Sequence, residues 1–315
     1  MKLLQSTPAT AGVLLCAALL LGGCAAPQTR ALLAEPAGLM QASVKLDDTP
    51  FFPQEDYQCG PAALATVLVS AGAKVTPEEL VPQVYLPERQ GSLQIEMLAA
   101  TRRQGMLAYV LAPRLEDLLR EVAAGRPAVV LQNLSLPIFP RWHYAVVIGY
   151  DRQREHILLR SGTTRELSMP LSTFEHTWAR SGHWALLALP PGQLPATARE
   201  TDYVAAAAAL ERLGPAAALP AYEAALQRWP GNAVARIGVG NVAYAQRDLA
   251  AAEAAYRRAT QDHADAADAW NNLAQVLHER GRSDEARRAA QRAVELGGPR
   301  LAQYQSTLQA VGAGR

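Results

Sequence analysis

The C-terminal third of the chain repeats itself with a period of about 34 residues, and this periodicity restricts the possible folds more than any other feature. Small and aromatic residues return at fixed offsets in three successive copies. In register, these are Ala218/Tyr222/Ala225/Pro230, Ala252/Tyr256/Ala259/Ala264 and Ala286/Ala290/Ala293/Gly298. Small residues at fixed spacing let paired helices approach closely, and aromatic side chains fill the groove between them. The pattern therefore predicts stacked helix pairs rather than a generic Ala-rich bundle.

This pattern resembles the tetratricopeptide repeat, which has the same period and the same small and aromatic positions. The copy around Trp270 is the clearest, and the first copy is degenerate because Asp202 stands at the position of Trp270. A stack of three repeats needs a polar end, so residues 300–311 are expected to form a capping helix. The resemblance implies an all-α solenoid over residues 199–311 that binds a protein partner.

The first 23 residues have the pattern of an export signal. Lys2 supplies a positive charge, and the uncharged apolar stretch over 11–23 is too short for a spanning helix, which needs roughly 20 residues. The stretch ends at Leu21-Gly22-Gly23-Cys24, which resembles the bacterial lipoprotein box, where the signal is cut before the cysteine and its thiol is acylated. The alternative is an ordinary signal peptide cut near Ala25 or Ala26. We expect lipidation at Cys24.

The residues after Cys24 bear on location and partners. By resemblance, Ala25 favours the outer membrane of a Gram-negative cell, so the protein is expected to face the periplasm on a lipid anchor. Residues 24–48, with Pro27 and Pro36, are expected to form a tether. The formal net charge of +1 does not indicate a nucleic-acid partner.

Residues 49–191 mix helical and strand patterns. Helices are expected over 60–71, 77–80, 93–104 and 115–123. Strands are expected over 108–111, 128–131, 143–150, 157–160, 165–169 and 184–189. Helices followed by strands are typical of an α+β domain. The segments Pro190-Pro191-Gly192 and Leu194-Pro195 mark its boundary with the repeats.

Cys59 is expected to be the only free thiol of the mature protein. The chain has three cysteines, but Cys16 lies in the leader and Cys24 is the expected lipid site. A lone thiol in an exported protein cannot form an internal disulfide. Cys59 directly precedes Gly60-Pro61 at the start of a predicted helix, whose dipole would favour a thiolate. We therefore predict that Cys59 is a catalytic nucleophile.

A cysteine nucleophile needs an imidazole close to it in space. Among the six histidines, His143 is the best candidate because it begins an apolar strand that would hold the ring in place and shield it from water. His183 also precedes a strand, near the end of the domain. The others are expected to be ordinary surface or core residues: His156, His176, His263 and His278.

A developing oxyanion needs a hydrogen-bond donor. Gln54 lies shortly before Cys59, and its side-chain amide could donate in the same pocket. The alternative is that Gln54 is an ordinary loop residue. The side chain of Gln58, directly beside the nucleophile, is expected to point away.

Three segments together resemble the bacteriocin-processing, double-glycine leader peptidases, a family of papain-like cysteine peptidases. They are Pro53-Gln54, the run from Gln58 to Leu64, and the run from His143 to Asp151. The match covers roughly residues 48–190. It implies Cys59 as nucleophile, His143 as general base, Gln54 as oxyanion donor, and a protein or peptide substrate, without a metal or cofactor. No nucleotide-binding motif is present, which excludes the transporter-fused type.

One position departs from the family pattern, in which an Asp about 17 residues after the histidine orients the imidazole. Ser161 stands in that stretch here. Asp151 lies roughly 26 Å along the same strand, at about 3.3 Å per residue, which is too far. Asn133 lies on the preceding strand and could pair across a hairpin with the His143 strand. Ser161 and Asn133 remain equal candidates for the third position.

Three functions therefore stay open. The favoured one is an envelope-anchored cysteine peptidase whose repeats recruit a partner or substrate. The missing acid motivates the second, a non-catalytic protein-binding lipoprotein on a peptidase-like fold. The third is acyl or peptidyl transfer by the same cysteine and histidine.

Overall fold

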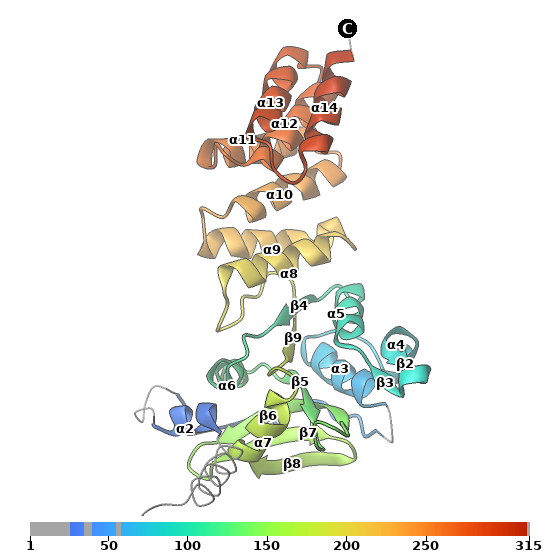
Figure 1. Ribbon diagram of the computed structural model, residues 1–315, viewed down its shortest axis with the longest axis vertical. Coiled ribbons are helices and arrows are strands. Elements are labelled where there is room, and N and C mark those ends of the chain that lie inside the picture. The colour runs from blue at the N-terminus through green and yellow to red at the C-terminus, as the bar shows by residue number, and fades with distance from the viewer. Residues whose placement is uncertain (1–25, 35–39, 55–57, 314–315) are drawn as a thin grey trace, which may run out of the picture.

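The computed structural model describes residues 26–34, 40–54 and 58–313. The expectations for the signal segment 1–23 and for Cys24 concern residues outside this part. A mixed α/β domain comes first, and a stack of helices then extends away from it toward the C-terminus (Figure 1).

An antiparallel sheet forms the centre of the first domain. Its strands follow the order β4-β9-β5-β6-β7-β8, and β1 also pairs with β6. Their bounds are β1 Ser43–Lys45, β4 Leu107–Val110, β5 Ala128–Asn133, β6 Trp142–Asp151, β7 His156–Ser161, β8 Thr164–Pro170 and β9 Ala185–Leu189. Along one edge of β6, β5 pairs as far as Val147 and β1 pairs from Gly149 onward. A Cβ at Gly149 would lie 2.4 Å from the carbonyl oxygen of Val44, so β1 can approach only a glycine.

Helices cover both faces of this sheet. One face packs against α3 (Cys59–Ser70), with α4 (Pro77–Val84) and α5 (Gln94–Arg103) beside it (Figure 1). The other face packs against α6 (Leu115–Ala123) and α7 (Leu171–Ala179). In β6, Tyr144 and Val146 belong to the core under α3, whereas Ala145 and Val147 belong to the opposite core. Because both faces are covered, β6 is a continuous apolar run rather than an alternating one.

The α+β prediction is confirmed, and the predicted helices and strands correspond to α3–α6 and β4–β9. The sequence patterns missed the hairpin of β2 (Tyr85–Leu86) and β3 (Gly91–Ser92), whose turn is the 3-10 helix η2 (Pro87–Arg89). They also missed α7, which has no acidic residue in its first turn and no capping side chain. These elements carry almost no local signal, and their tertiary contacts stabilise them.

The prediction of a tether over 24–48 is wrong for the described residues of that range. They include β1 and the helix α2 (Pro27–Ala34), which docks on α6 and α7. The buried carboxylate of Glu175 accepts hydrogen bonds from the backbone N–H groups of Gln28 (2.9 Å) and Thr29 (2.6 Å). These first-turn donors have no partner inside the helix. Composition suggested a linker, but a carboxylate 146 residues away fixes the segment.

Within the described residues, seven helices follow the sheet. They are α8 (Glu200–Glu211), α9 (Pro215–Arg228), α10 (Ala233–Ala245), α11 (Leu249–Asp262), α12 (Ala267–Glu279), α13 (Ser283–Leu296) and α14 (Leu301–Ala313). The small residues permit close packing, as predicted. A Cβ at Gly238 would lie 2.3 Å from the ring of Tyr222, and one at Gly240 would lie 2.4 Å from the ring of Tyr256. The helix α14 packs on α12 and α13 at the end of the stack.

The helical stack is attached to the first domain through a shared core. The helix α8 packs on β4, and the rings of Tyr109 and Tyr203 lie 6.5 Å apart across this contact. The buried carboxylate of Glu121 accepts hydrogen bonds from the backbone N–H groups of Ala196 (3.1 Å) and Thr197 (2.6 Å). The connecting segment is therefore fastened to α6. Among the described helices, none has the length and apolar character needed to cross a bilayer.

Candidate active site

Cys59 is the first residue of α3, which begins one position before the start predicted at residue 60. It forms no disulfide with any described residue and is partly buried. A Cβ at Gly60 would lie 2.1 Å from Oγ of Ser92, so only glycine allows β3 to lie against the first turn of the helix. The thiol is thereby placed at a helix N-terminus in a crowded, partly dry position.

Two opposing effects act on the pKa of the Cys59 thiol. Burial raises it, because a thiolate loses hydration, and this effect is the largest. Hydrogen bonds from the backbone of Tyr144, Gly60 and Cys59 itself lower it. The net shift is upward, so the thiol form is favoured in the free protein. The Tyr144 hydrogen bond also places the sulfur at the start of β6, directly after His143.

The imidazole of His143, a residue of β6, reaches toward the end of the neighbouring strand β7. Its Nε2 is 2.9 Å from Oγ of Ser161. When Nε2 donates its hydrogen to this hydroxyl, Nδ1 is the basic nitrogen. Burial, and secondarily the nearby charge of Arg141, lower the pKa of His143 from 6.5 to about 4. The ring is therefore neutral at pH 7 and able to accept a proton.

The two candidates for the third position have different roles. Ser161 contacts His143, whereas the side-chain oxygen of Asn133 accepts hydrogen bonds from the backbone N–H groups of Ser135 (3.0 Å) and Arg141 (2.9 Å). The expected pairing of the two strands is present, and Asn133 lies opposite Trp142. Its side-chain oxygen organises the β5–β6 loop, which favours Ser161 of the two candidates as the residue that orients His143.

Asp151, which the sequence excluded, lies at the opposite end of β6 from His143. It pairs there with Ser43 and His156, and its carboxylate accepts a hydrogen bond from the backbone N–H of Arg154 at 2.9 Å. It is therefore engaged in the β6–β7 turn and not in the candidate site.

Gln54 lies close to the turn that follows Ser161. Its backbone N–H donates to the carbonyl of Gly162 at 3.3 Å. Its side-chain Oε1 is buried and has no hydrogen-bond partner among the described residues. Gln54 and Gln58 line one pocket of about 550 Å³ beside the first turns of α3 and α4. The predicted position of Gln54 near the site agrees with this backbone contact, and its role as oxyanion donor stays a prediction.

A groove of about 390 Å³, which the sequence patterns did not predict, adjoins the candidate site. Its lining includes Arg89, Gly91, Ser92, Leu93, Gln94, Leu131, Trp142, Tyr144, Arg180 and Ser181. The groove meets the site at Tyr144, whose backbone forms a hydrogen bond with the Cys59 thiol, and at Ser92, which packs on Gly60. The hydroxyl of Tyr144 donates to the carbonyl of Ser92 at 3.2 Å, which joins β6 to β3 across the groove floor. The only sequence feature that pointed to this groove was Trp142, directly before His143.

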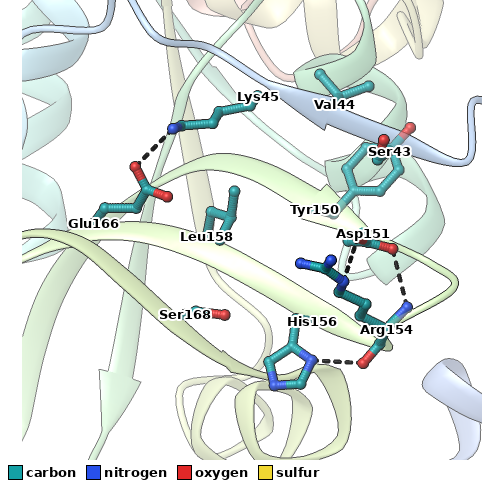
Figure 2. Close-up of a pocket in the computed structure, with 10 residues that line it drawn as sticks. All are labelled: Ser43, Val44, Lys45, Tyr150, Asp151, Arg154, His156, Leu158, Glu166 and Ser168. Atoms are coloured by element: carbon teal, nitrogen blue, oxygen red, sulfur yellow. Dashed lines mark hydrogen bonds and ion pairs between the residues drawn. The ribbon is translucent and has the colours of Figure 1, made fainter.

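A separate pocket of about 640 Å³ lies on β1, β6, β7 and β8 (Figure 2). None of the candidate site residues lines it. Its charged groups are paired, because Lys45 Nζ lies 2.8 Å from the Glu166 carboxylate and Arg154 contacts Asp151 (Figure 2). The ring of His156 is also engaged, with Nδ1 2.5 Å from the carbonyl oxygen of Arg154. These pairings leave no reactive arrangement in this pocket.

His183, the second histidine considered, has a different surrounding. Its Nε2 lies 3.3 Å from the side-chain nitrogen of Gln28 in α2, and its ring packs edge-on against Trp178. It therefore belongs to the contact with α2. In the described part of the chain, no group of three or more His, Cys, Asp or Glu residues could hold a metal ion.

Comparison with known proteins relates each part of the chain to a family. The model of the Peptidase_C39 like family matches residues 46–186, and that of the tetratricopeptide repeat matches 203–263 and 240–300. No curated protein sequence matches the chain.

Three solved structures are similar to parts of the chain. A C39-like peptidase from Bacillus anthracis is 20% identical over 47% of this chain and 98% of its own, with a TM-score of 0.40. The peptidase domain of Streptococcus ComA, a bi-functional ABC transporter involved in a quorum sensing pathway, is 20% identical over 45% and 98%, with a TM-score of 0.37. MamA is 19% identical over 37% and 68%, with a TM-score of 0.33. By the family models, residues 46–186 match the Peptidase_C39 like family and residues 203–300 match tetratricopeptide repeats, as both resemblances implied.

Proposed function

We propose that the protein is a cysteine peptidase that hydrolyses peptide bonds. Cys59 is the nucleophile, His143 the general base and Ser161 a positioning residue for the imidazole. The observation that carries the proposal is the 2.9 Å contact between His143 Nε2 and Ser161 Oγ at the strand end where the thiol lies. With Nε2 engaged by Ser161, Nδ1 is the ring nitrogen that would take the thiol proton in this proposal.

The pKa shifts support a neutral resting pair of thiol and imidazole. In the first step, Nδ1 of His143 takes the thiol proton while sulfur attacks the peptide carbonyl carbon. The C–N bond then breaks, and the imidazolium gives its proton to the leaving amine. A water molecule, deprotonated by His143, hydrolyses the thioester and restores the thiol. Backbone N–H groups around Cys59, and the amide of Gln54, are the proposed donors to the oxyanion.

The location and the repeats belong to the same proposal. Acylation of Cys24 would anchor the chain to the outer membrane, facing the periplasm, and the repeats would recruit a protein partner or substrate. Support for the anchor comes from the Leu21-Gly22-Gly23-Cys24 pattern. Support for recruitment comes from the groove over α10, α11 and α12, lined by Asn241, Tyr244, Tyr256, Asn272 and Gln275.

A peptide carrying a thiol-directed warhead tests the peptidase proposal. The native protein should be labelled at Cys59, and Cys59→Ala should abolish labelling. The exposed Ser168→Ala serves as a matched control for Ser161→Ala, because both remove one strand hydroxyl. Native Cys59 that stays unlabelled, while the denatured protein labels fully, would refute the proposal.

A second candidate function is protein binding without catalysis. It is favoured by Ser161 in place of an acid and by the upward pKa of Cys59. A strain carrying Cys59→Ala separates the two functions. If it behaves as wild type while deletion of 199–311 does not, binding through the repeats is the function. Acyl or peptidyl transfer, the third possibility, is distinguished from hydrolysis by the masses of the products.

A further inference from the structure

The loop between β5 and β6, residues 134–141, presents large apolar side chains to solvent. Leu136, Ile138 and Phe139 are 60%, 76% and 73% exposed, and Trp142 beside them is 50% exposed. The loop contains no acidic residue and ends at the exposed Arg141. Contiguous exposed apolar side chains next to a cation are typical of an interaction surface.

The backbone of this loop is firmly held. Leu134 N–H donates to the carbonyl of Arg141 at 2.9 Å, which closes the loop at its base. The guanidinium of Arg180 donates to the carbonyls of Asn133 (3.0 Å) and Ser135 (2.7 Å). The apolar tip is therefore displayed outward by a network of hydrogen bonds, and burying it in a partner would not require the loop to become ordered.

The loop and the N-terminal helix are attached to the same turn. Arg180 and His183 belong to the turn that ends α7, where His183 N–H donates to the carbonyl of Trp178. Arg180 holds the loop at Ser135, and His183 contacts Gln28 in the first turn of α2. The helix α2 begins at Pro27, close behind Cys24 in the sequence. An anchor at Cys24 would be only three residues from a helix that contacts the same α7 turn as the loop.

We propose that the β5–β6 loop inserts into the surface of a lipid bilayer. Leu136, Ile138 and Phe139 would enter the boundary between headgroups and acyl chains, and Arg141 would meet anionic headgroups. Trp142 would lie at the interface, which favours aromatic rings. The contact itself does not depend on peptidase activity. Under the proposed function, insertion of the loop would place the groove lined by Trp142 near polypeptide segments that lie close to the membrane surface.

Quenching of Trp142 fluorescence by brominated lipids tests the insertion. The full acylated chain is reconstituted in vesicles of phosphatidylcholine and phosphatidylglycerol with brominated acyl chains. The fluorescence of Trp142 is obtained by subtracting the emission of the Trp142→Phe variant from that of the wild-type protein. We expect brominated chains to reduce it at least about twofold, because the ring would lie at the interface. The variant Ile138→Ser/Phe139→Ser, with its anchor intact, should lose this reduction, whereas the control Leu213→Ser/Val234→Ser on the repeats should keep it.

Equal quenching of Trp142 in the loop variant and in wild type would overturn the inference, and so would its absence in wild type. If a peptide substrate shields Trp142 while brominated vesicles have no effect, the loop binds polypeptide instead of lipid. Both substituted side chains are mostly exposed, so the variant is expected to fold. Warhead labelling of Cys59 in the same samples reports on the proposed function separately.

Discussion

Ser161 Oγ lies 2.9 Å from His143 Nε2, across the neighbouring strands β7 and β6. A hydroxyl orients the ring by accepting its N–H, but it has no charge with which to stabilise an imidazolium. Burial, with a smaller effect of the Arg141 charge, therefore lowers the pKa of His143 to about 4. The contact thus gives the imidazole an uncharged partner, and burial favours the neutral forms of both Cys59 and His143.

The charge at position 161 should control the reactivity of Cys59. We expect Ser161→Ala to slow warhead labelling about tenfold, because the ring loses its orienting contact. Ser161→Asp should raise the pKa of His143 and move the labelling profile to lower pH. The neutral Ser161→Asn is the matched control. Labelling rates between pH 5 and 10 are the measurement, and identical profiles for the Asp and Asn variants would rule out this role.

The protein should lose stability as the pH falls from about 6.5 to about 4. In that window His143 binds a proton in the unfolded chain but stays neutral in the folded one. Lowering the pH therefore favours the unfolded state, by at most roughly 3 kcal/mol for this residue. Urea unfolding of wild type and His143→Gln across this range isolates the contribution. A constant difference between the two proteins would contradict the lowered pKa.

Asn133→Ala should destabilise the fold without changing the chemistry of the site. The backbone N–H groups of Ser135 and Arg141 would lose their acceptor, at a cost of about 1–3 kcal/mol. The pH profile of Cys59 labelling should stay that of wild type, in contrast to the profile of Ser161→Asp. If the folded Asn133→Ala variant shows a shifted pH profile of Cys59 labelling, Asn133 does act on the candidate site.

Glu121→Ala should loosen the connection between the peptidase domain and the repeats. The carboxylate is fully buried and accepts hydrogen bonds from Arg126, Ala196 and Thr197, so its removal should cost about 3–5 kcal/mol. Glu116→Ala, which loses only surface ion pairs with arginines, is the control. Thermal unfolding and limited proteolysis measure the change. Unaltered cleavage within 190–199 would show that other contacts hold the segment.

Gly238→Ala should destabilise the repeats by about 1–3 kcal/mol, because the added Cβ would overlap the ring of Tyr222. Gly231→Ala, with open space around the position, should have little effect. Thermal unfolding followed by circular dichroism compares the two variants. Equal melting temperatures would show that the helices separate without cost.

The sequence alone could not decide whether Asn133 or Ser161 contacts His143. The family pattern suggested Ser161 as the partner of His143, and the predicted strand pairing suggested Asn133. The strand register places Asn133 opposite Trp142. The side-chain oxygen of Asn133, however, accepts hydrogen bonds from two backbone N–H groups of the loop, and no sequence pattern predicted these bonds. The fold of α2 was also beyond the sequence, since Glu175 supplies its capping hydrogen bonds from far along the chain.

Periodicity and local motifs were sufficient for the repeat stack, the helix start at Cys59 and the buried strand that begins at His143, because each depends on spacing and on immediate neighbours. The choice of Ser161, the close approach of β3 to Gly60 and the display of the β5–β6 loop were decided only by the tertiary structure. Those features depend on hydrogen bonds and contacts between residues far apart in the chain. Such contacts become available only after the sheet has formed.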